Sequence, residues 1–359
     1  PMYYLGAPYG STTDADDSAF EPGIAIGTGP FVVEELVTDD HLTLTKNETY
    51  WDGTPKLDTL TIRTISNGDT LSAALQAGDI DAAYGMAYEA YPNFENDKYQ
   101  FSSIQTSRVF FCSMNMTSSI LQDEAVRQAV AMGINKQGFV DTLLDGHGVP
   151  AAGAFPTGFS TFGSEHVTTE GYDPDGAKAL LEAAGWVDSD GDGIREKDGV
   201  KLELRWLTYP SRQELPLLAE AAQASLKELG MAVDINCTAN RREFLADMGS
   251  WDIYASALVT APSGDPQYFF TTSCLPGMSY NFGAYENEAV TDLISQLSTE
   301  FDPARRGELA IELQQAILDD HAFVFCSFLE MSMISKSNVT GYTAHACDYY
   351  QVTADLDIT

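Results

Sequence analysis

Residues 201–208, KLELRWLT, begin the stretch of sequence that decides the fold. Leu202, Leu204 and Trp206 alternate with charged residues, and this period of two is typical of a strand with one buried face. The stretch therefore predicts a β-strand, and the residues after it indicate how that strand is paired.

The residues that follow repeat a helix and a strand twice. Residues 213–229 predict a helix that ends at Gly230, and residues 231–237, MAVDINC, alternate again. Residues 240–248 predict a second helix, and residues 251–258 predict a third strand. Because strands separated by helices pair in parallel through right-handed crossovers, the sequence predicts an α/β fold.

The chain before this stretch has a different pattern. Residues 31–37 and 41–46 predict a hairpin, residues 60–63 a further strand, and residues 70–77 a helix that ends at Gly78. We therefore expect two lobes, each with a mixed sheet and flanking helices.

Three aspartates predict the start of further helices. Asp173 and Asp302 are each followed by proline, which suits the first helical position, and Asp123 precedes an apolar pattern of helical period. Residues 322–329 are almost wholly apolar and predict a buried strand near the end of the chain.

The charge balance excludes several kinds of partner. Among 359 residues, 19 Lys and Arg stand against 53 Asp and Glu, giving a net charge of −34. Nucleic acids and anionic membrane surfaces both require a basic face, so neither is expected as a partner. No apolar run approaches the length of a membrane span.

The cysteines carry no metal or redox motif. The chain has five, none spaced as CxxC, and an odd number leaves at least one outside any intramolecular pair: Cys112, Cys237, Cys274, Cys326 and Cys347. We interpret them as core residues.

An acidic loop is the sharpest local motif. Asp188, Asp190 and Asp192 stand at alternate positions and glycine follows, as at the start of a calcium loop. The twelfth position is Gly199 where a bidentate acid is needed, so Glu196 would have to supply that ligand. The alternative is an Asp- and Gly-rich turn without an ion.

No motif for catalysis is present. The sequence has no GxSxG, no HExxH and no phosphate-loop lysine, and adjacent carboxylates such as Asp319 and Asp320 point apart in regular structure. We expect a binding protein that requires no cofactor, rather than an enzyme. The alternatives are a calcium-binding receptor or adhesion module and a hydrolase that uses carboxylates in a cleft.

Several short strings occur together in a recognisable order. They are residues 27–31 (GTGPF), 47–51 (NETYW), 55–58 (PKLD), 73–81 (AALQAGDID), 126–129 (VRQA), 177–181 (AKALL), 184–186 (AGW) and 251–252 (WD). In this order they resemble the extracytoplasmic solute-binding proteins, family 5, that serve ABC importers of oligopeptides, dipeptides and nickel.

The resemblance implies a two-lobe fold like that of periplasmic binding proteins, of the class II type, with an incomplete first lobe. Residues 1–106 would be the later part of lobe I, residues 107–338 lobe II, and residues 339–359 a return to lobe I. The hinge would lie near Arg108 and residues 336–340, and a segment of lobe I would precede the chain.

The resemblance also implies two ligand classes. Three strings are similar to the nickel-type branch: residues 107–111 (SRVFF), 261–262 (AP) and 332–336 (SMISK). Pro262 stands where dipeptide-binding members carry an aspartate for the peptide amine. Met278 stands where the nickel branch has a histidine ligand, and a thioether suits nickel poorly. A nickel chelate and a short peptide therefore both remain open.

Arg108 is the leading candidate for a ligand contact. A guanidinium can hold a ligand carboxylate through two parallel hydrogen bonds, and the alternative is a salt bridge within this acidic chain. The other candidates are polar, aromatic or thioether side chains that suit an adaptable pocket: Tyr84, Met86, Thr260, Asp265, Met278, Tyr280 and Tyr349.

These observations predict a substrate-binding component of an ABC importer. It would capture a small solute or peptide between two lobes by hinge closure and deliver it to the permease subunits. We expect a monomer outside the cytoplasmic membrane, periplasmic or held by a lipid anchor.

Overall fold

The computed structural model describes residues 27–65, 67–159 and 161–359. The chain divides into two compact units. Of the described residues, unit 1 contains 27–65, 67–104, 331–345 and 349–359, and unit 2 contains 105–159, 161–330 and 346–348. The first 26 residues of the expected lobe I lie outside the described part of the chain.

Unit 2 contains the predicted strand–helix repeat. Strands β9 (Glu203–Thr208), β10 (Ala232–Cys237) and β11 (Ile253–Val259) are joined by α5 (Glu214–Lys227) and α6 (Arg241–Ala246). β9 pairs in parallel with β10 and with β11, which confirms the expected crossovers. The sheet continues in the order β10-β9-β11-β5-β12-β4, and β6 (Gly148–Pro150) pairs with β12.

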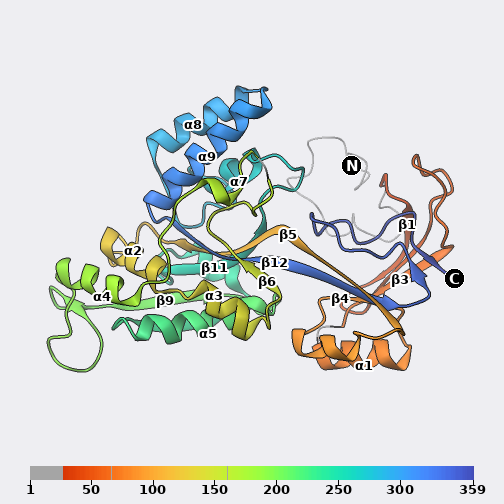
Figure 1. Ribbon diagram of the computed structural model, residues 1–359, viewed down its shortest axis with the longest axis horizontal. Helices are drawn as coiled ribbons and strands as arrows, with labels where there is room; N and C mark the ends of the chain where they lie inside the picture. Colours follow the sequence, from red (N-terminus) through yellow and green to blue (C-terminus); the bar gives the residue numbers. More distant parts are fainter. Residues whose placement is uncertain (1–26, 66, 160) are drawn as a thin grey trace. The chain divides into compact units, whose positions relative to one another are not determined.

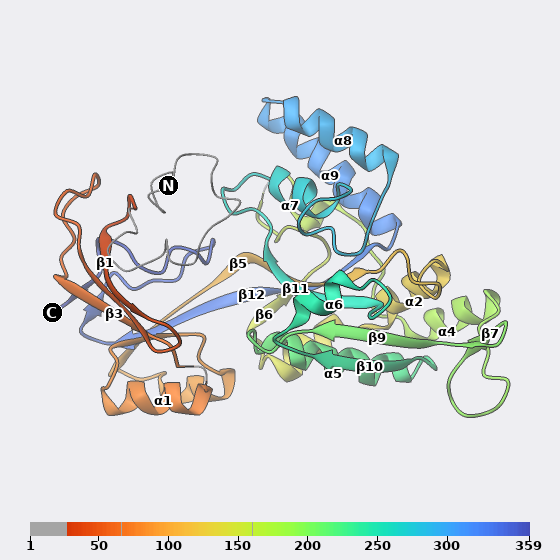
Figure 2. The same ribbon diagram turned by 180° about the vertical axis from the view of Figure 1, so that it is seen from behind.

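Helices cover both faces of this sheet in unit 2. Figures 1 and 2 show α7, α8 and α9 on one face and α3, α4 and α5 on the other. The bounds are α2 Glu124–Gly133, α3 Lys136–Gly138, α4 Pro174–Ala183, α7 Gln267–Ser273, α8 Glu288–Thr299 and α9 Pro303–Asp319. Shorter elements are the π-helical turn η4 (Phe139–Leu143), the 3-10 turn η5 (Ser164–His166), β7 (Glu196–Lys197) and β8 (Val200–Lys201).

The helix starts follow the predicted aspartates. Asp123, Asp173 and Asp302 each accept a hydrogen bond from a backbone N–H in the first turn of α2, α4 and α9, respectively. Proline occupies the first turn of α4 and of α9. These caps satisfy donors that the helix itself leaves unpaired, so local sequence was enough to locate them.

The core of unit 2 is a dense group of aromatic rings. Phe111 lies 6.1 Å from Phe269 and 5.9 Å from Phe325, measured between ring centroids. Edge-to-face and tilted pairs of this kind add to the energy of burial. Leu309 and Leu313 of α9 belong to the same cluster, so β5, β12 and the helices α7 and α9 share one interior.

Unit 1 has a smaller sheet of its own. β1 (Phe31–Val37), β2 (His41–Lys46) and β3 (Thr59–Arg63) form an antiparallel sheet, as the hairpin pattern predicted. The other elements are α1 (Gly68–Ala77), β4 (Ala82–Tyr84), the 3-10 helix η3 (Tyr88–Asn93), β13 (Val339–Thr340) and β14 (Asp357–Ile358). Gly78 ends α1 with a positive φ of 86°, a conformation that glycine adopts without strain.

Two long strands carry the chain from one unit to the other. β5 (Tyr99–Met114) passes from unit 1 to unit 2 after Ile104, and β12 (Phe323–Lys336) passes back after Glu330. β12 is longer than the apolar run of residues 322–329 that predicted it, because its unit 1 end is more polar. Among the described residues, no helix combines the length and apolarity needed to cross a membrane.

Candidate functional site

Arg108 forms a buried ion pair with the chain itself. It lies on β5 with 8% of its surface exposed. Its Nε donates to Asp348 Oδ2 at 2.5 Å and its Nη2 donates to Asp348 Oδ1 at 3.0 Å. This is the bidentate geometry that the sequence suggested for a ligand carboxylate, and here the partner is a carboxylate of the same protein.

Asp348 belongs to a short C-terminal segment that joins unit 2. Residues 346–348 cluster with unit 2, although the residues on both sides of them belong to unit 1. The Ser107 N–H donates to the Ala346 carbonyl at 3.0 Å, beside the ion pair. Sequence reasoning missed Asp348 because 240 positions separate it from Arg108. The only indication in the sequence was general: an arginine in an apolar strand needs a carboxylate partner somewhere in the chain.

Thr260 lies next to Arg108. Val259 at the end of β11 is paired with Arg108 in the sheet. The Thr260 hydroxyl donates to the Ser107 carbonyl at 3.1 Å, and the side chain is fully buried. The structure therefore brings two of the predicted ligand contacts together. Any contact of either with a ligand stays a prediction.

Asp265 is held by Arg306 of α9. Arg306 Nη2 donates to Asp265 Oδ2 at 2.6 Å, and Nη1 donates at 2.7 Å to the carbonyls of Leu297 and Glu300. Asp265 Oδ1 also accepts from the Gln267 N–H at 2.8 Å. The carboxylate therefore ties the start of α7 to the connection between α8 and α9.

Met278 and Tyr280 lie in the loop after α7 with exposed side chains. The Tyr280 ring is 6.1 Å from that of Phe282, which is 5.3 Å from that of Tyr254. Burial raises the pKa of the Tyr254 hydroxyl well above its ordinary value. The exposed Tyr280 is thus connected to a buried aromatic group that sequence reasoning did not identify.

The remaining candidates belong to unit 1, and the two units are described separately. Tyr84 on β4 lines a cavity of about 610 Å³ between β3, α1, β4 and the C-terminal segment. Most of its other lining side chains are apolar, including Leu60, Ile62 and Leu356. Met86 is buried, with 1% of its surface exposed, whereas Tyr349 is 59% exposed.

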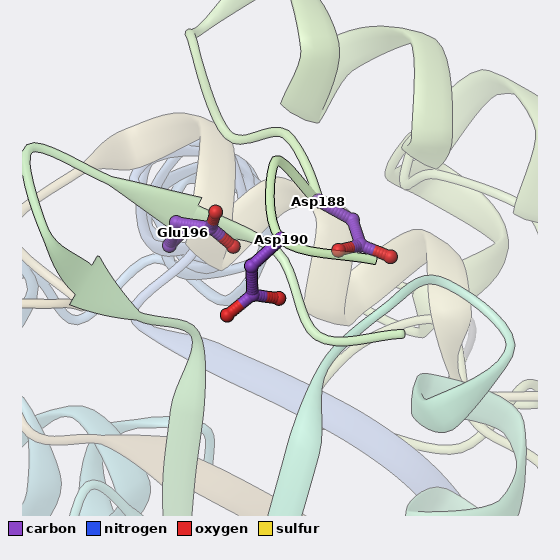
Figure 3. A group of neighbouring side chains, drawn as sticks. All are labelled: Asp188, Asp190 and Glu196. Atoms are coloured by element: carbon purple, nitrogen blue, oxygen red, sulfur yellow. The ribbon is translucent and has the colours of Figure 1, made fainter. Parts of the chain in front are cut away.

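The acidic loop gathers three of its four predicted carboxylates. One oxygen each of Asp188, Asp190 and Glu196 lie within 4.8 Å of one another. Figure 3 shows these three side chains. Asp188 accepts hydrogen bonds from the N–H groups of Gly191 at 2.7 Å and Gly193 at 3.0 Å. These bonds are those of an aspartate-stabilised turn, and they use part of the capacity that a metal would need.

A lysine supplies positive charge at this loop. Lys201 Nζ donates to Asp190 Oδ2 at 3.1 Å and also to Asp192. These hydrogen bonds raise the pKa of Lys201 and lower that of Asp192. The loop therefore has an internal cation for two of its acids, and calcium binding at this position stays a prediction.

A sequence profile of the bacterial extracellular solute-binding proteins, family 5 (middle region), matches residues 1–281. The chain belongs to this family. The resemblance noted from its short strings is confirmed.

Named relatives bind peptides or nickel. The chain is 27% identical over 340 residues to the oligopeptide-binding protein AppA of Bacillus subtilis, covering 92% of this chain and 62% of AppA. It is 24% identical over 342 residues to the nickel-binding protein NikA of Staphylococcus aureus, covering 94% of this chain and 66% of NikA. The chain thus spans less than two thirds of the length of these curated relatives.

A solved structure establishes the fold. The crystal structure of NikA from S. aureus in complex with Ni(L-His)2 matches with a TM-score of 0.83 and 23% identity, covering 97% of this chain and 72% of that one. The predicted α/β fold of periplasmic binding proteins is therefore confirmed.

Proposed function

We propose that this protein is the substrate-binding component of an ABC importer. It captures a small solute and delivers it to permease subunits in the membrane. It works outside the cytoplasmic membrane, in the periplasm or held there by a lipid anchor. The observation that carries the proposal is the family match over residues 1–281, together with relatives that are binding proteins by name.

The ionisable groups support a binding role over catalysis. A carboxyl group that serves as a general acid needs a raised pKa. Five carboxyl groups of the described residues have a pKa that departs clearly from its ordinary value, and in all five the pKa is lowered: Asp58, Asp123, Glu170, Asp192 and Asp252. Each is hydrogen-bonded to a lysine, an arginine or a histidine, which is the environment of a structural ion pair.

The solute is a nickel chelate or a short peptide. The relatives include an oligopeptide-binding and a nickel-binding protein, and the similar NikA structure is a complex with Ni(L-His)2. Peptides and histidine both carry a carboxylate group. Arg108 is the residue we assign to such a carboxylate, because its guanidinium is preorganised in the bidentate geometry by Asp348. A ligand would take that position by exchange with Asp348 or by sharing the guanidinium with it.

A thermal-shift experiment tests the proposal. The probes are NiCl2 alone, NiCl2 with free histidine, and mixtures of dipeptides and of longer peptides. A ligand at about 100 times its dissociation constant adds roughly 2.7 kcal/mol to the free energy of unfolding, which is a shift of several degrees. We expect such a shift with NiCl2 plus histidine, with the dipeptides or with the longer peptides. If none of these three probes shifted the melting temperature, capture of these solutes would be contradicted.

Paired variants locate the site. In Arg108→Lys the ammonium cannot make the bidentate contact, so we expect the ligand-induced shift to fall or disappear. Arg205→Lys is the matched control, because Arg205 makes a similar bidentate pair with Asp252 at 2.8 Å in unit 2. An equal loss in both variants would indicate general destabilisation and would remove Arg108 from the site.

A further inference from the structure

Two buried thiols lie side by side on neighbouring strands of unit 2. The Sγ atoms of Cys112 on β5 and Cys326 on β12 are 3.9 Å apart, and neither residue is exposed. β5 and β12 are adjacent in the sheet. Among the described residues, Cys112 and Cys326 are the two cysteines whose sulfur atoms lie in contact.

The alternation of side chains explains how the two meet. Phe111 and Phe325, which precede the two cysteines, belong to the aromatic core against α7 and α9. Because neighbouring side chains of a strand point to opposite faces, Cys112 and Cys326 share the other face of the sheet. An S–S bond of about 2.0 Å needs each sulfur to move by about 1 Å, which a small side-chain rotation supplies.

The surroundings distinguish the two thiols. Burial raises the pKa of Cys112, whereas the hydrogen bond with Cys112 lowers the pKa of Cys326. Lys136 of α3 adds positive charge near both, and its Nζ donates to the Ala151 carbonyl at 3.2 Å. In the folded protein Cys326 is therefore the more readily ionised of the two thiols.

We propose that Cys112 and Cys326 form a disulfide that joins β5 to β12 inside unit 2. The oxidant is a low-molecular-weight disulfide such as oxidised glutathione. The thiolate of one of the two cysteines attacks a glutathione sulfur and expels a glutathione thiolate. The thiolate of the other cysteine then attacks the cysteine sulfur of this mixed disulfide and expels the second glutathione thiolate. Two thiols lose two protons and two electrons, and one oxidised glutathione becomes two reduced molecules.

The burial of both sulfurs determines when this reaction takes place. A glutathione molecule cannot reach them in the closed core, so exchange occurs during folding, before α3 and the sheet come together. The bond closes a loop from residue 112 to residue 326, and such long loops gain most from a crosslink. It fixes the unit 2 ends of the two strands that pass between the units.

Peptide mapping tests the bond directly. The protein is unfolded and refolded in a buffer of oxidised and reduced glutathione, blocked with N-ethylmaleimide in denaturant, and digested with trypsin. Residues 109–127 and 307–336 are tryptic peptides that each contain a single cysteine, Cys112 and Cys326. We expect these two peptides to be linked, and three of the five cysteines to be labelled. Five labelled cysteines, or a link between other peptides, would overturn the proposal.

Matched variants separate the bond from ordinary packing. In Cys112→Ala we expect Cys326 to become labelled and the urea midpoint to lose its sensitivity to dithiothreitol. Cys274→Ala is the control, since Cys274 is equally buried, and we expect it to retain both the link and the sensitivity. If dithiothreitol lowered the urea midpoint of Cys112→Ala as much as that of the wild type, a stabilising role of the bond would be contradicted. If a variant fails to fold, the peptide map of the wild-type protein alone decides whether the bond forms.

Discussion

Unit 2 and unit 1 differ in how completely they cover their sheets. In unit 2, helices pack on both faces and the aromatic core around Phe111 is closed. In unit 1, the sheet β1–β3 leaves apolar side chains exposed, among them Leu36 at 49% and Ile62 at 42%, beside a cavity of about 610 Å³. Since burial of apolar area drives folding, unit 2 carries most of the stability of the described chain.

The largest test of this comparison uses matched truncations in the two units. Phe111→Ala removes a buried ring and should cost about 4 kcal/mol, whereas Leu36→Ala should cost less than about 1 kcal/mol. Urea unfolding followed by tryptophan fluorescence measures unit 2, because Trp186, Trp206 and Trp251 are buried there.

Hydrogen exchange of the peptides from β1–β3 provides the corresponding measurement for unit 1. We expect faster exchange there than in β9–β11, because sparse packing permits local opening. Equal protection in the two sheets would contradict the difference in coverage.

The second test removes one partner of the buried ion pair. Asp348→Ala leaves the Arg108 guanidinium buried without its carboxylate and should lower the free energy of unfolding by about 3 kcal/mol. The same urea experiment measures it. The double variant with Arg108→Ala should recover part of the loss, because no uncompensated charge remains. If the loss of free energy in the double variant equalled the sum of the losses in Asp348→Ala and Arg108→Ala, the two groups would not interact.

The third test concerns acid sensitivity in unit 2. Burial favours the neutral form of Asp252, but hydrogen bonds from Arg205 and Ser118 outweigh it and lower the pKa of this carboxyl. A lowered folded pKa gives stability above the unfolded value near pH 4 that is lost as the pH falls through the folded value. We expect the difference in urea midpoint between wild type and Asp252→Asn to shrink from about pH 6 to about pH 3. Asp79→Asn, at an exposed site in unit 1, is the control for replacing an aspartate by asparagine.

The smallest effect is expected at the acidic loop. Lys201→Met removes the internal cation from Asp190 and Asp192, and a surface pair of this kind contributes little to stability. A calcium ion would no longer compete with the ammonium, so calcium should raise the melting temperature of the variant more than that of the wild type. Equal responses, measured against a chelator control, would contradict calcium binding there.

Local patterns predicted the elements whose causes are local. The parallel repeat from β9 to β11, the caps at Asp123, Asp173 and Asp302, and the hairpin of β1 and β2 all follow from neighbouring residues. The partner of Arg108 could not be predicted from neighbouring residues, because it depends on how residues 346–348 return to β5. The contact of Cys112 with Cys326 likewise requires the sheet order.

The return of residues 346–348 to unit 2 has a consequence for synthesis on the ribosome. Unit 2 is assembled almost wholly from residues 105–330, yet Arg108 lacks its carboxylate until Asp348 has been made. Unit 1 needs residues still later in the sequence, since Leu356 and Ile358 line its cavity. During synthesis, each unit therefore completes its packing only after residues far beyond its first strands have been added to the chain.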